Sequence, residues 1–466
     1  MKVVLWIILL TIASSQCLHP YPKISVKKRA LGDCGEPLLL TPHIENSQIA
    51  QAKQLARVPI TDDLGIESYS GFFTVNKTFD SNQFFWYFPS MSRDRDTAPI
   101  LLWLQGGPGG SSMFGLFTEN GPLRVRNGSF ERREYHWALN HHLIYIDNPV
   151  GAGFSFTNHE EGYLSDEIQL GEQLYSTLIQ FFKLFPELQQ NEFFISGESY
   201  AGKYVPALGY TIHKKNPTAD SKINLKGLAI GNGLTDPVNQ VVLYSDYLYQ
   251  IGLVDLNERT TLEGYEDKLK QHIENNEWNE ASDVFNTLVG RDMIEGKSYL
   301  TNVTGFNSWF NYLHTEDYSD GDDFSTMLQN STVRRGIHVG QASYNGSSTI
   351  VELRFKEDMM QSVAPWLSEL LSYYDCLIYA GQMDIILPYP FTVNYLRKLK
   401  FDGSEEYKTA ERNFWKVDGE LAGYVKRGGR LVEALVRNSG HMVPMDQPKW
   451  AWDLITRFTH HMSYLT

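Results

Sequence analysis

Short apolar runs alternating with helical periods dominate the hydrophobic pattern of the chain. Six runs are apolar on both faces and bounded by glycine, proline or asparagine: residues 99–104, 143–146, 193–196, 225–230, 376–380 and 431–436. Such runs are typical of central strands in a mostly parallel sheet that is covered on both faces. Helical periods at residues 164–185 and 204–215 lie between them. The alternation predicts an α/β fold, a central mostly parallel sheet flanked by helices.

Two more strand patterns precede the first of these runs. Residues 68–75 and 83–88 are rich in aromatic side chains and are separated by a turn, which predicts an antiparallel hairpin. Upstream, glycines and prolines interrupt residues 30–58, and we expect a loop there.

Residues 236–334 break the alternation, because they are charged, rich in asparagine and helical in period. Asp255 and Glu258 have the spacing of a capping box that begins a helix. Four residues repeat along one face of that helix: Leu262, Tyr265, Leu269 and Ile273. We expect an inserted helical cap between a first core part, residues 18–235, and a second, residues 335–466. The alternative is an ordinary helical layer of the same domain.

The N-terminus has the pattern of a secretory signal peptide. A lysine at position 2 is followed by an apolar stretch over residues 3–13 and then by small and polar residues. We assign residues 1–17 to the signal, with cleavage after Ser15 or Cys17. No later segment offers about 18 uninterrupted apolar residues, so we expect no membrane span.

Glycosylation motifs and cysteine use agree with the secretory pathway. Five Asn-x-Ser/Thr sequons start at Asn76, Asn127, Asn302, Asn330 and Asn345. Beyond Cys17 the chain has only Cys34 and Cys376, which form either one bridge or two buried thiols.

The charge balance excludes one class of partner. The 466 residues carry a formal net charge of -14, and no basic stripe is visible. Nucleic-acid backbones need such a stripe, so we expect no nucleic-acid partner.

One serine follows a predicted buried strand in a tight turn. Ser199 stands in Gly-Glu-Ser-Tyr-Ala-Gly, residues 197–202. Small residues on both sides allow the sharp turn of a nucleophile elbow, which lifts the hydroxyl out of the sheet. The motif alone is also compatible with a plain turn, so a base and an acid are needed.

Two other predicted strands end in candidates for these partners. His441 follows residues 431–436, and Asp384 follows residues 376–380. The carboxyl ends of parallel strands carry the reacting groups of α/β sheets, and the order Ser199, Asp384, His441 is that of α/β-hydrolases.

The remaining candidates suit structural positions better. His141 and His142 precede a strand, and we expect structural or solvated side chains. His460 and His461 lie in the last predicted helix and should face water. Asp446 precedes Gln-Pro and is expected to cap a helix.

A glycine-rich segment at residues 103–112 follows another strand end. No Gly-Lys-Ser/Thr follows, which argues against a phosphate-binding loop. Backbone N–H groups here, with that of Tyr200, could bind an oxyanion. The alternative is a loop whose small residues serve packing alone. We predict no cofactor and no metal.

Several motifs together resemble the serine carboxypeptidase family. They lie at residues 103–112, 117–122, 147–155, 197–202, 231–233 and 439–441. The likeness runs from about residue 68 to the C-terminus and is closest to the vitellogenic-like carboxypeptidase branch. It implies an α/β-hydrolase fold with Ser199, Asp384 and His441 as the triad, and an oxyanion hole at Gly107 and Tyr200.

The resemblance also implies how substrate is held. Family residues that match Trp103, Gln105, Gly106, Glu198 and Glu119 surround the free C-terminal carboxylate of a peptide. A carboxyl group beside that carboxylate forms a strong hydrogen bond only while one of them keeps its proton, so we expect a raised pKa for Glu198. Activity should therefore be best in acid, as in lysosomes or yolk.

Three positions qualify the resemblance. Gln105 stands where most of the family has asparagine, and Gly110 replaces a common cysteine, so the usual disulfides cannot form. Met442 matches a residue of the pocket for the last side chain.

The sequence thus predicts a secreted or lysosomal serine carboxypeptidase, a monomer or homodimer, acting on peptides or proteins with a free C-terminus. Similar folds also act as acyltransferases or esterases. A catalytically silent storage glycoprotein is the alternative outside the enzymes.

Overall fold

A computed structural model describes residues 32–290, 298–317 and 323–464. The predicted signal peptide, residues 1–17, lies outside the described residues.

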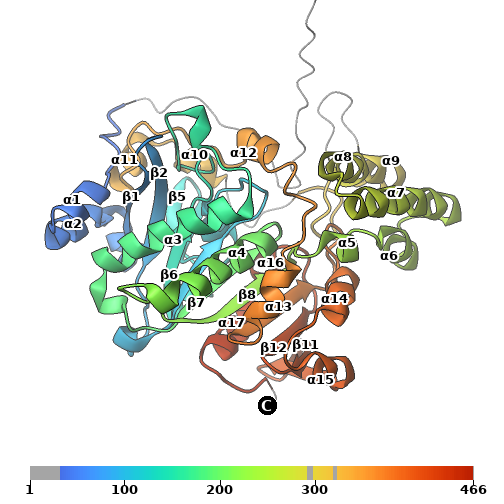
Figure 1. Cartoon of the computed structure of the whole chain (residues 1–466). Coiled ribbons are helices and arrows are strands. Elements are labelled where there is room, and N and C mark those ends of the chain that lie inside the picture. Colours follow the sequence, from blue (N-terminus) through green and yellow to red (C-terminus); the bar gives the residue numbers. More distant parts are fainter. Residues whose placement is uncertain (1–31, 291–297, 318–322, 465–466) are drawn as a thin grey trace, which may run out of the picture.

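A ten-stranded sheet forms the centre of the molecule (Figure 1). Its spatial order is β1-β2-β6-β3-β7-β8-β9-β12-β11-β10. The six strands from β6 to β12 in this order are parallel to one another. At one edge β2 and β1 are added by antiparallel pairing, and at the other edge β11 and β10 are added in the same way. The strand bounds are β1 Tyr69–Asn76, β2 Ser81–Phe88, β3 Ile100–Leu104, β6 His142–Ile146, β7 Phe193–Glu198, β8 Leu225–Gly231, β9 Asp375–Gly381, β10 Asn413–Val417, β11 Glu420–Gly428 and β12 Leu431–Val436.

Both faces of the parallel core are covered by helices. Leu228 of β8 lies near Gly209 of α4 (Ala201–Lys215), whereas Phe194 of β7 packs its ring on Phe458 of α17 (Pro448–Thr459). Phe194 is paired with Gly227, one residue before Leu228, and neighbouring residues of a strand point to opposite faces. Helices α4 and α17 therefore lie on opposite faces, and α3 (Glu167–Leu184) packs beside α4.

This arrangement confirms the predicted α/β-hydrolase fold with a central mostly parallel sheet. The two-sided burial explains the apolar runs, since every residue of β3, β6, β7 and β12 is buried. The predicted hairpin is β1 and β2, which pair antiparallel.

The prediction of a loop over residues 30–58 was wrong for residues 41–56. Two helices form there, α1 (Thr41–Glu45) and α2 (Ile49–Ala56). Pro42 was interpreted as a breaker, but it stands in the first turn of α1, where its missing N–H costs no hydrogen bond. Helix α2 buries Ala52 and Ala56, small residues that give no strong apolar signal.

The segment predicted as a cap is helical. The capping box of Asp255 and Glu258 is present at the start of α7, and Leu262, Leu269 and Ile273 are buried while Tyr265 is half-buried. Helices α6 to α9 gather to one side of the sheet in Figure 1. The division at residues 236 and 334 stays a prediction. The helices of this segment are α5 Pro237–Gln240, α6 Tyr244–Gln250, α7 Leu256–Glu274, α8 Trp278–Val289, α9 Tyr299–Thr304, α10 Phe324–Met327 and α11 Ser331–Gly336.

The remaining elements surround this framework. A separate hairpin joins β4 (Leu123–Arg126) to β5 (Ser129–Arg132). The other helices are α12 Thr349–Arg354, α13 Ala364–Leu370, α14 Tyr389–Lys398, α15 Ser404–Thr409 and α16 Val443–Asp446, with a π-helix, η3, at Gly115–Glu119. Short 3-10 turns lie at Pro59–Leu64, Arg95–Thr97, Trp137–Leu139, Glu160–Gly162, Pro186–Leu188 and Asn216–Thr218.

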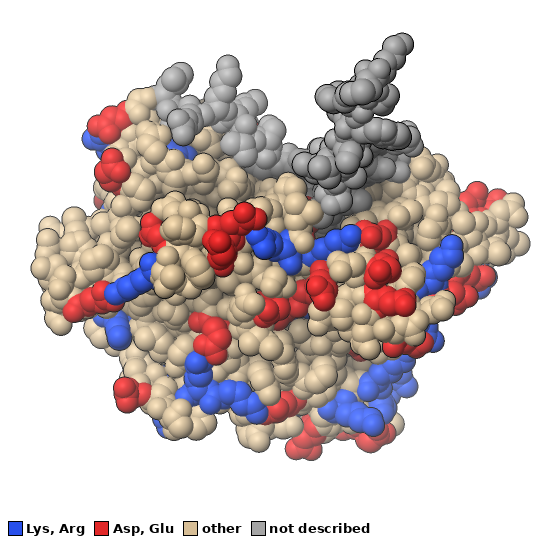
Figure 2. Space-filling view, turned by 45° about the horizontal axis from the view of Figure 1, so that its top comes forward, with Lys and Arg blue, Asp and Glu red and all other residues tan. Residues whose placement is uncertain are grey.

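Cys34 and Cys376 are buried free thiols. Figure 2 shows Lys and Arg side chains interspersed with Asp and Glu over the visible face. Among the described residues no helix has the length and apolar character needed to cross a membrane.

Candidate active site

Ser199 occupies a strained turn between β7 and α4. Its φ is +63°, a conformation that serine rarely adopts. Two neighbouring glycines make the turn possible. A Cβ on Gly106 would lie 2.6 Å from the Tyr200 backbone nitrogen, and one on Gly202 would lie 2.6 Å from that of Leu234. The local geometry is therefore that of a nucleophile elbow, which the motif predicted.

His441 and Asp384 form a buried hydrogen-bonded pair. Nδ1 of His441 lies 2.7 Å from Oδ2 of Asp384, and neither side chain is exposed. The other Asp384 oxygen accepts the backbone N–H of Ile386 at 2.8 Å. A carboxylate that accepts at Nδ1 fixes the imidazole tautomer in which Nε2 can take a proton.

Asn232 is a residue whose role the sequence reasoning missed. Its Nδ2 donates to Asp384 Oδ2 at 2.6 Å, and its Oδ1 accepts the Gly381 N–H at 3.1 Å. The signal was present, because Asn232 follows a strand within Gly-Asn-Gly. This amide holds the acid loop and satisfies a buried oxygen of Asp384.

Four adjacent strand ends supply these groups. Ser199 follows β7, Asn232 follows β8, Asp384 follows β9 and His441 follows β12. The four strands are neighbours and parallel, so their carboxyl ends meet at one edge of the sheet. The register of the sheet thus brings together residues that lie far apart in sequence.

A cavity lies against Ser199. Gly107 and Tyr200, the predicted oxyanion residues, are among its lining residues. The remaining wall is mostly apolar and comes from α8, from the loop after β9 and from residues near β8 and α12. These residues are Leu234, Phe285, Asn286, Val289, Gly290, Met359, Ile386 and Leu387. A site of this composition suits an apolar side chain next to the serine.

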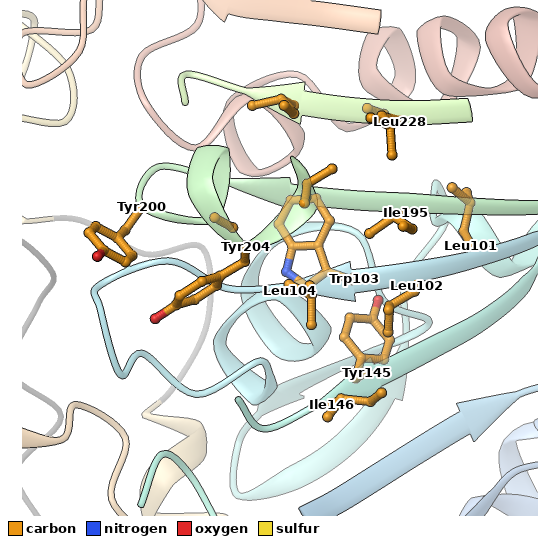
Figure 3. Close-up of a cluster of buried hydrophobic side chains, with 14 of the residues drawn as sticks. Leu101, Leu102, Trp103, Leu104, Tyr145, Ile146, Ile195, Tyr200, Tyr204 and Leu228 are labelled. Atoms are coloured by element: carbon orange, nitrogen blue, oxygen red, sulfur yellow. The ribbon is translucent and has the colours of Figure 1, made fainter. Parts of the chain in front are cut away.

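The predicted carboxylate-binding residues form a buried chain that ends beside Ser199. Trp103 donates from Nε1 to Gln105 Oε1 at 2.9 Å, and Gln105 donates from Nε2 to Glu198 Oε1 at 3.3 Å. Figure 3 shows Trp103 among the buried residues of β3 and its neighbours. A Cβ on Gly115 would lie 2.2 Å from Trp103 Nε1, so only glycine allows η3 to approach. Glu119 is the last residue of η3.

Burial raises the pKa of both glutamates in this group. The pKa of Glu119 rises from an ordinary 4.5 to about 7, because desolvation outweighs the lowering influence of the neighbouring Glu198 and Gln105 side chains. The pKa of Glu198 is raised well above its ordinary value, first by desolvation and then by the charge of Glu119. Ionisation of both carboxyl groups in such a buried pair is unfavourable, because the like charges repel each other.

Other predicted residues lie outside this constellation. Met442 is buried next to His441 but is not among the residues that line the described cavity, and its role stays a prediction. His141 and His142 are buried, in agreement with a structural role. His460 and His461 face water just after α17 ends at Thr459.

The expectation that Asp446 caps a helix was wrong. It lies at the end of α16, and Oδ2 accepts the Gly440 N–H at 2.6 Å and the Asn311 Nδ2 group at 3.0 Å. Gln447 is the N-cap of α17, with no side-chain cap bond. The Asp446 carboxylate instead holds the loop of His441.

The five sequons differ in accessibility. Asn127, Asn302 and Asn330 are exposed, whereas Asn76 and Asn345 are half-buried. Nδ2 of Asn345 also donates to Gly151 O at 3.3 Å. Their glycosylation stays a prediction.

The sheet and the residues at its strand ends define an α/β-hydrolase. The chain belongs to the serine carboxypeptidase family, whose model matches residues 59–461. The protein is accordingly a serine-type carboxypeptidase, a hydrolase of peptide bonds.

Known relatives extend over almost the whole chain. A venom serine carboxypeptidase of Apis mellifera is 53% identical and covers 93% of this chain and 92% of its own length. A vitellogenic carboxypeptidase of Aedes aegypti is 49% identical, with 97% and 96% covered. The probable serine carboxypeptidase CPVL of Homo sapiens is 44% identical, with 94% and 92% covered. These relatives confirm the resemblance to the vitellogenic-like branch.

A solved structure shares the fold. The prohormone-processing carboxypeptidase Kex1 of Saccharomyces cerevisiae superposes with a TM-score of 0.69 at 22% identity, covering 88% of this chain and 95% of its own.

Proposed function

We propose that this carboxypeptidase cleaves the last peptide bond of its substrate through an acyl-enzyme on Ser199. His441 takes the proton from the Ser199 hydroxyl through Nε2 while the oxygen attacks the carbonyl carbon. Backbone N–H groups of Gly107 and Tyr200 stabilise the resulting oxyanion. His441 then protonates the leaving amine, which departs as a free amino acid, and water releases the acyl group by the same steps in reverse.

One observation carries the specificity for a C-terminus. The buried chain from Trp103 through Gln105 to Glu198 ends at the residue next to the nucleophile. A substrate carboxylate bound at this chain would place the adjacent peptide bond within reach of Ser199. Gly106, which lies against Ser199 and Tyr200, completes this site by leaving room for close approach. Glu119 belongs to the same buried group, and its charge acts on Glu198.

The same group of carboxyls sets the pH dependence. Glu198 donates a hydrogen bond to the substrate carboxylate only while protonated, and an ionised pair would repel it. Because burial raises the pKa of Glu119 to about 7 and also raises the pKa of Glu198 well above its ordinary value, binding is strongest in acid.

A pair of substrates tests this proposal. We expect a blocked dipeptide to be cleaved at pH 5 far faster than its C-terminal amide, because only the free acid can bind the Trp103 and Glu198 group. Equal cleavage of both would contradict the proposed recognition of the free carboxylate. Labelling with a fluorophosphonate tests the nucleophile separately, since it needs Ser199 and His441 but no C-terminal carboxylate. A folded protein without label on Ser199 would be a silent glycoprotein.

We infer the location and the substrates of the protein from its sequence and its relatives. The signal pattern, the sequons and the names of the venom and vitellogenic relatives support a secreted or lysosomal protein that acts on peptides with a free C-terminus. Residues 236–334 act as a cap in this proposal, because Phe285 and Val289 of α8 line the cavity at Ser199. Size measurement in solution would distinguish a monomer from a homodimer.

A further inference from the structure

Residues 309–312, which lie between α9 and α10, contact the loop of the proposed catalytic acid. Trp309 O accepts the backbone N–H groups of Ile385 and Ile386, each at 3.0 Å. Tyr312 in turn donates its N–H to Met383 O at 3.0 Å. This one segment therefore binds the residues before Asp384 as well as those after it.

The same segment contacts the loop of the proposed base. Phe310 O accepts the His441 N–H at 2.6 Å, and the Phe310 ring stacks on the imidazole with centroids 5.6 Å apart and planes at 29°. Asn311 Nδ2 donates to Asp446, which also accepts the Gly440 N–H. A Cβ on Gly440 would lie 2.0 Å from Phe310 O, so the contact leaves no spare room.

A third contact reaches the cavity wall. Trp309 donates from Nε1 to Val289 O at 2.9 Å, at the end of α8 where Val289 lines the cavity. Trp309, Phe310 and Asn311 are all nearly inaccessible to solvent.

We propose that residues 309–312 are a clamp that sets the distance between the Asp384 and His441 loops, with Phe310 as the positioning residue for the His441 ring. Trp309 O and Phe310 O belong to consecutive residues, so only the φ and ψ angles of Phe310 can change their separation, and these buried residues have little room to move. Each carbonyl binds a different loop, so a rigid unit bridges acid and base. The clamp deepens the function proposed above and rests on it.

Kinetics of Phe310 variants test the clamp. We expect Phe310→Ala to lower kcat and the rate of fluorophosphonate labelling about 10- to 100-fold, because loss of alignment at the reacting centre has effects of this order. KM should change less than about 3-fold, since the carboxylate site is untouched. Phe310→Tyr keeps the ring and should restore both rates to within about 3-fold of the wild type. Phe306→Ala replaces a half-buried aromatic just upstream of residues 309–312 and serves as the matched control.

A measurement without turnover separates the clamp from the proposed function. The low-field proton resonance of the His441 Nδ1–H group, assigned by its loss in Asp384→Asn, reports the hydrogen bond directly. It should broaden or vanish in Phe310→Ala and Asn311→Ala while remaining in Phe310→Tyr and Phe306→Ala. Unchanged resonance and labelling in folded Phe310→Ala would overturn the clamp. Absence of labelling in the wild type, with the resonance present, would contradict the proposed function alone.

Discussion

Lys203 and Asp358 form a buried ion pair. The Lys203 ammonium donates to both the carboxylate and the backbone carbonyl of Asp358. Oδ2 of Asp358 also accepts the Tyr200 hydroxyl at 2.8 Å. Figure 3 shows Tyr200 and Tyr204 with their side chains beyond the end of the strand layer. The pair therefore ties the residue after Ser199 to Met359 at the cavity wall.

Asp358→Ala should destabilise the protein by about 3–5 kcal/mol, because it leaves the buried Lys203 charge without its carboxylate partner. The double variant Lys203→Met with Asp358→Leu should recover a large part of this loss, since no unpaired charge remains. Chemical denaturation measures both. As a control, Glu45→Ala removes the exposed partner of Lys77 and should cost less than about 1 kcal/mol. An equally small cost for Asp358→Ala would show that the buried pair contributes little.

Glu198→Gln should flatten the pH dependence of carboxypeptidase activity. The glutamine cannot titrate. Its amide donates a weaker hydrogen bond to the substrate carboxylate than the protonated Glu198 carboxyl does. We expect kcat/KM on a blocked dipeptide at pH 5 to fall at least about 10-fold, about 1.4 kcal/mol of transition-state stabilisation. Between pH 5 and 8 the wild type should decline as the Glu119 and Glu198 pair ionises, and the variant should decline less. A dipeptide amide gives the control, because its cleavage does not need this proton; a wild-type profile that rises with pH for the acid substrate would contradict the assignment.

Thermal stability should decrease as the pH rises from 5 to 7.5. The pKa of Glu119 is about 7 in the folded protein, against an ordinary value of 4.5, so between these values the folded chain holds a proton that the unfolded chain releases. Its stabilising contribution is complete below about pH 4.5 and is lost as the pH rises through about 7. Burial raises the pKa of several other carboxyls in the same direction: Glu198, Glu167, Asp147 and Asp446.

Calorimetry of Glu119→Gln measures how much this residue contributes to the pH dependence of thermal stability. One pKa unit corresponds to about 1.4 kcal/mol, so the variant should remove on the order of 1–3 kcal/mol of the pH dependence. Glu274→Gln on the exposed surface of α7 should leave the slope unchanged. Identical slopes for the wild type and Glu119→Gln would mean that Glu119 ionises normally.

Gly115→Ala should impair substrate binding more than nucleophile reactivity. The added methyl would lie 2.2 Å from Trp103 Nε1 and 2.9 Å from Gln105 Oε1, so the chain that leads to Glu198 must shift. We expect KM for a free-acid dipeptide to rise about 10-fold or more, with fluorophosphonate labelling within about 3-fold of the wild type. Gly264→Ala is a matched substitution in α7 with open space around it, and alanine there favours the helix by up to about 1 kcal/mol. An unchanged KM in Gly115→Ala would show that Trp103 takes no part in binding the substrate carboxylate.

The parts of the site predictable from sequence are those that depend on strand ends. Ser199, Asp384 and His441 each follow a two-sided apolar run, and parallel pairing brings such ends to one edge. Periodicity therefore gave both the sheet and the candidate residues. Asn232 occupied the same kind of position, but an amide between glycines also suits an ordinary turn, so no role was inferred.

Contacts between distant loops left no local signal. Trp309 and Phe310 bind loops more than 70 residues downstream through their backbone carbonyls, which every residue type possesses. Asp446 resembled a helix cap because the following Gln-Pro begins a helix, and its true partners come from Gly440 and Asn311. Helix α2 also left no clear signal, because its buried face consists of small residues. Strands β10 and β11 near the edge of the sheet are partly exposed, so they lack the uniform apolar runs of the central strands.

The pairing of β8 with β9 constrains how the chain folds during synthesis. These neighbours at the middle of the sheet are separated in sequence by everything between Gly231 and Asp375. Until β9 emerges from the ribosome, β8 is an unpaired edge with a row of free backbone groups beside the Ser199 turn. Closing so long a loop is slow, and the exposed edge favours aggregation. We therefore expect nascent chains that end before β9 to depend on chaperones, and the nucleophile to become competent only after translation has passed β12.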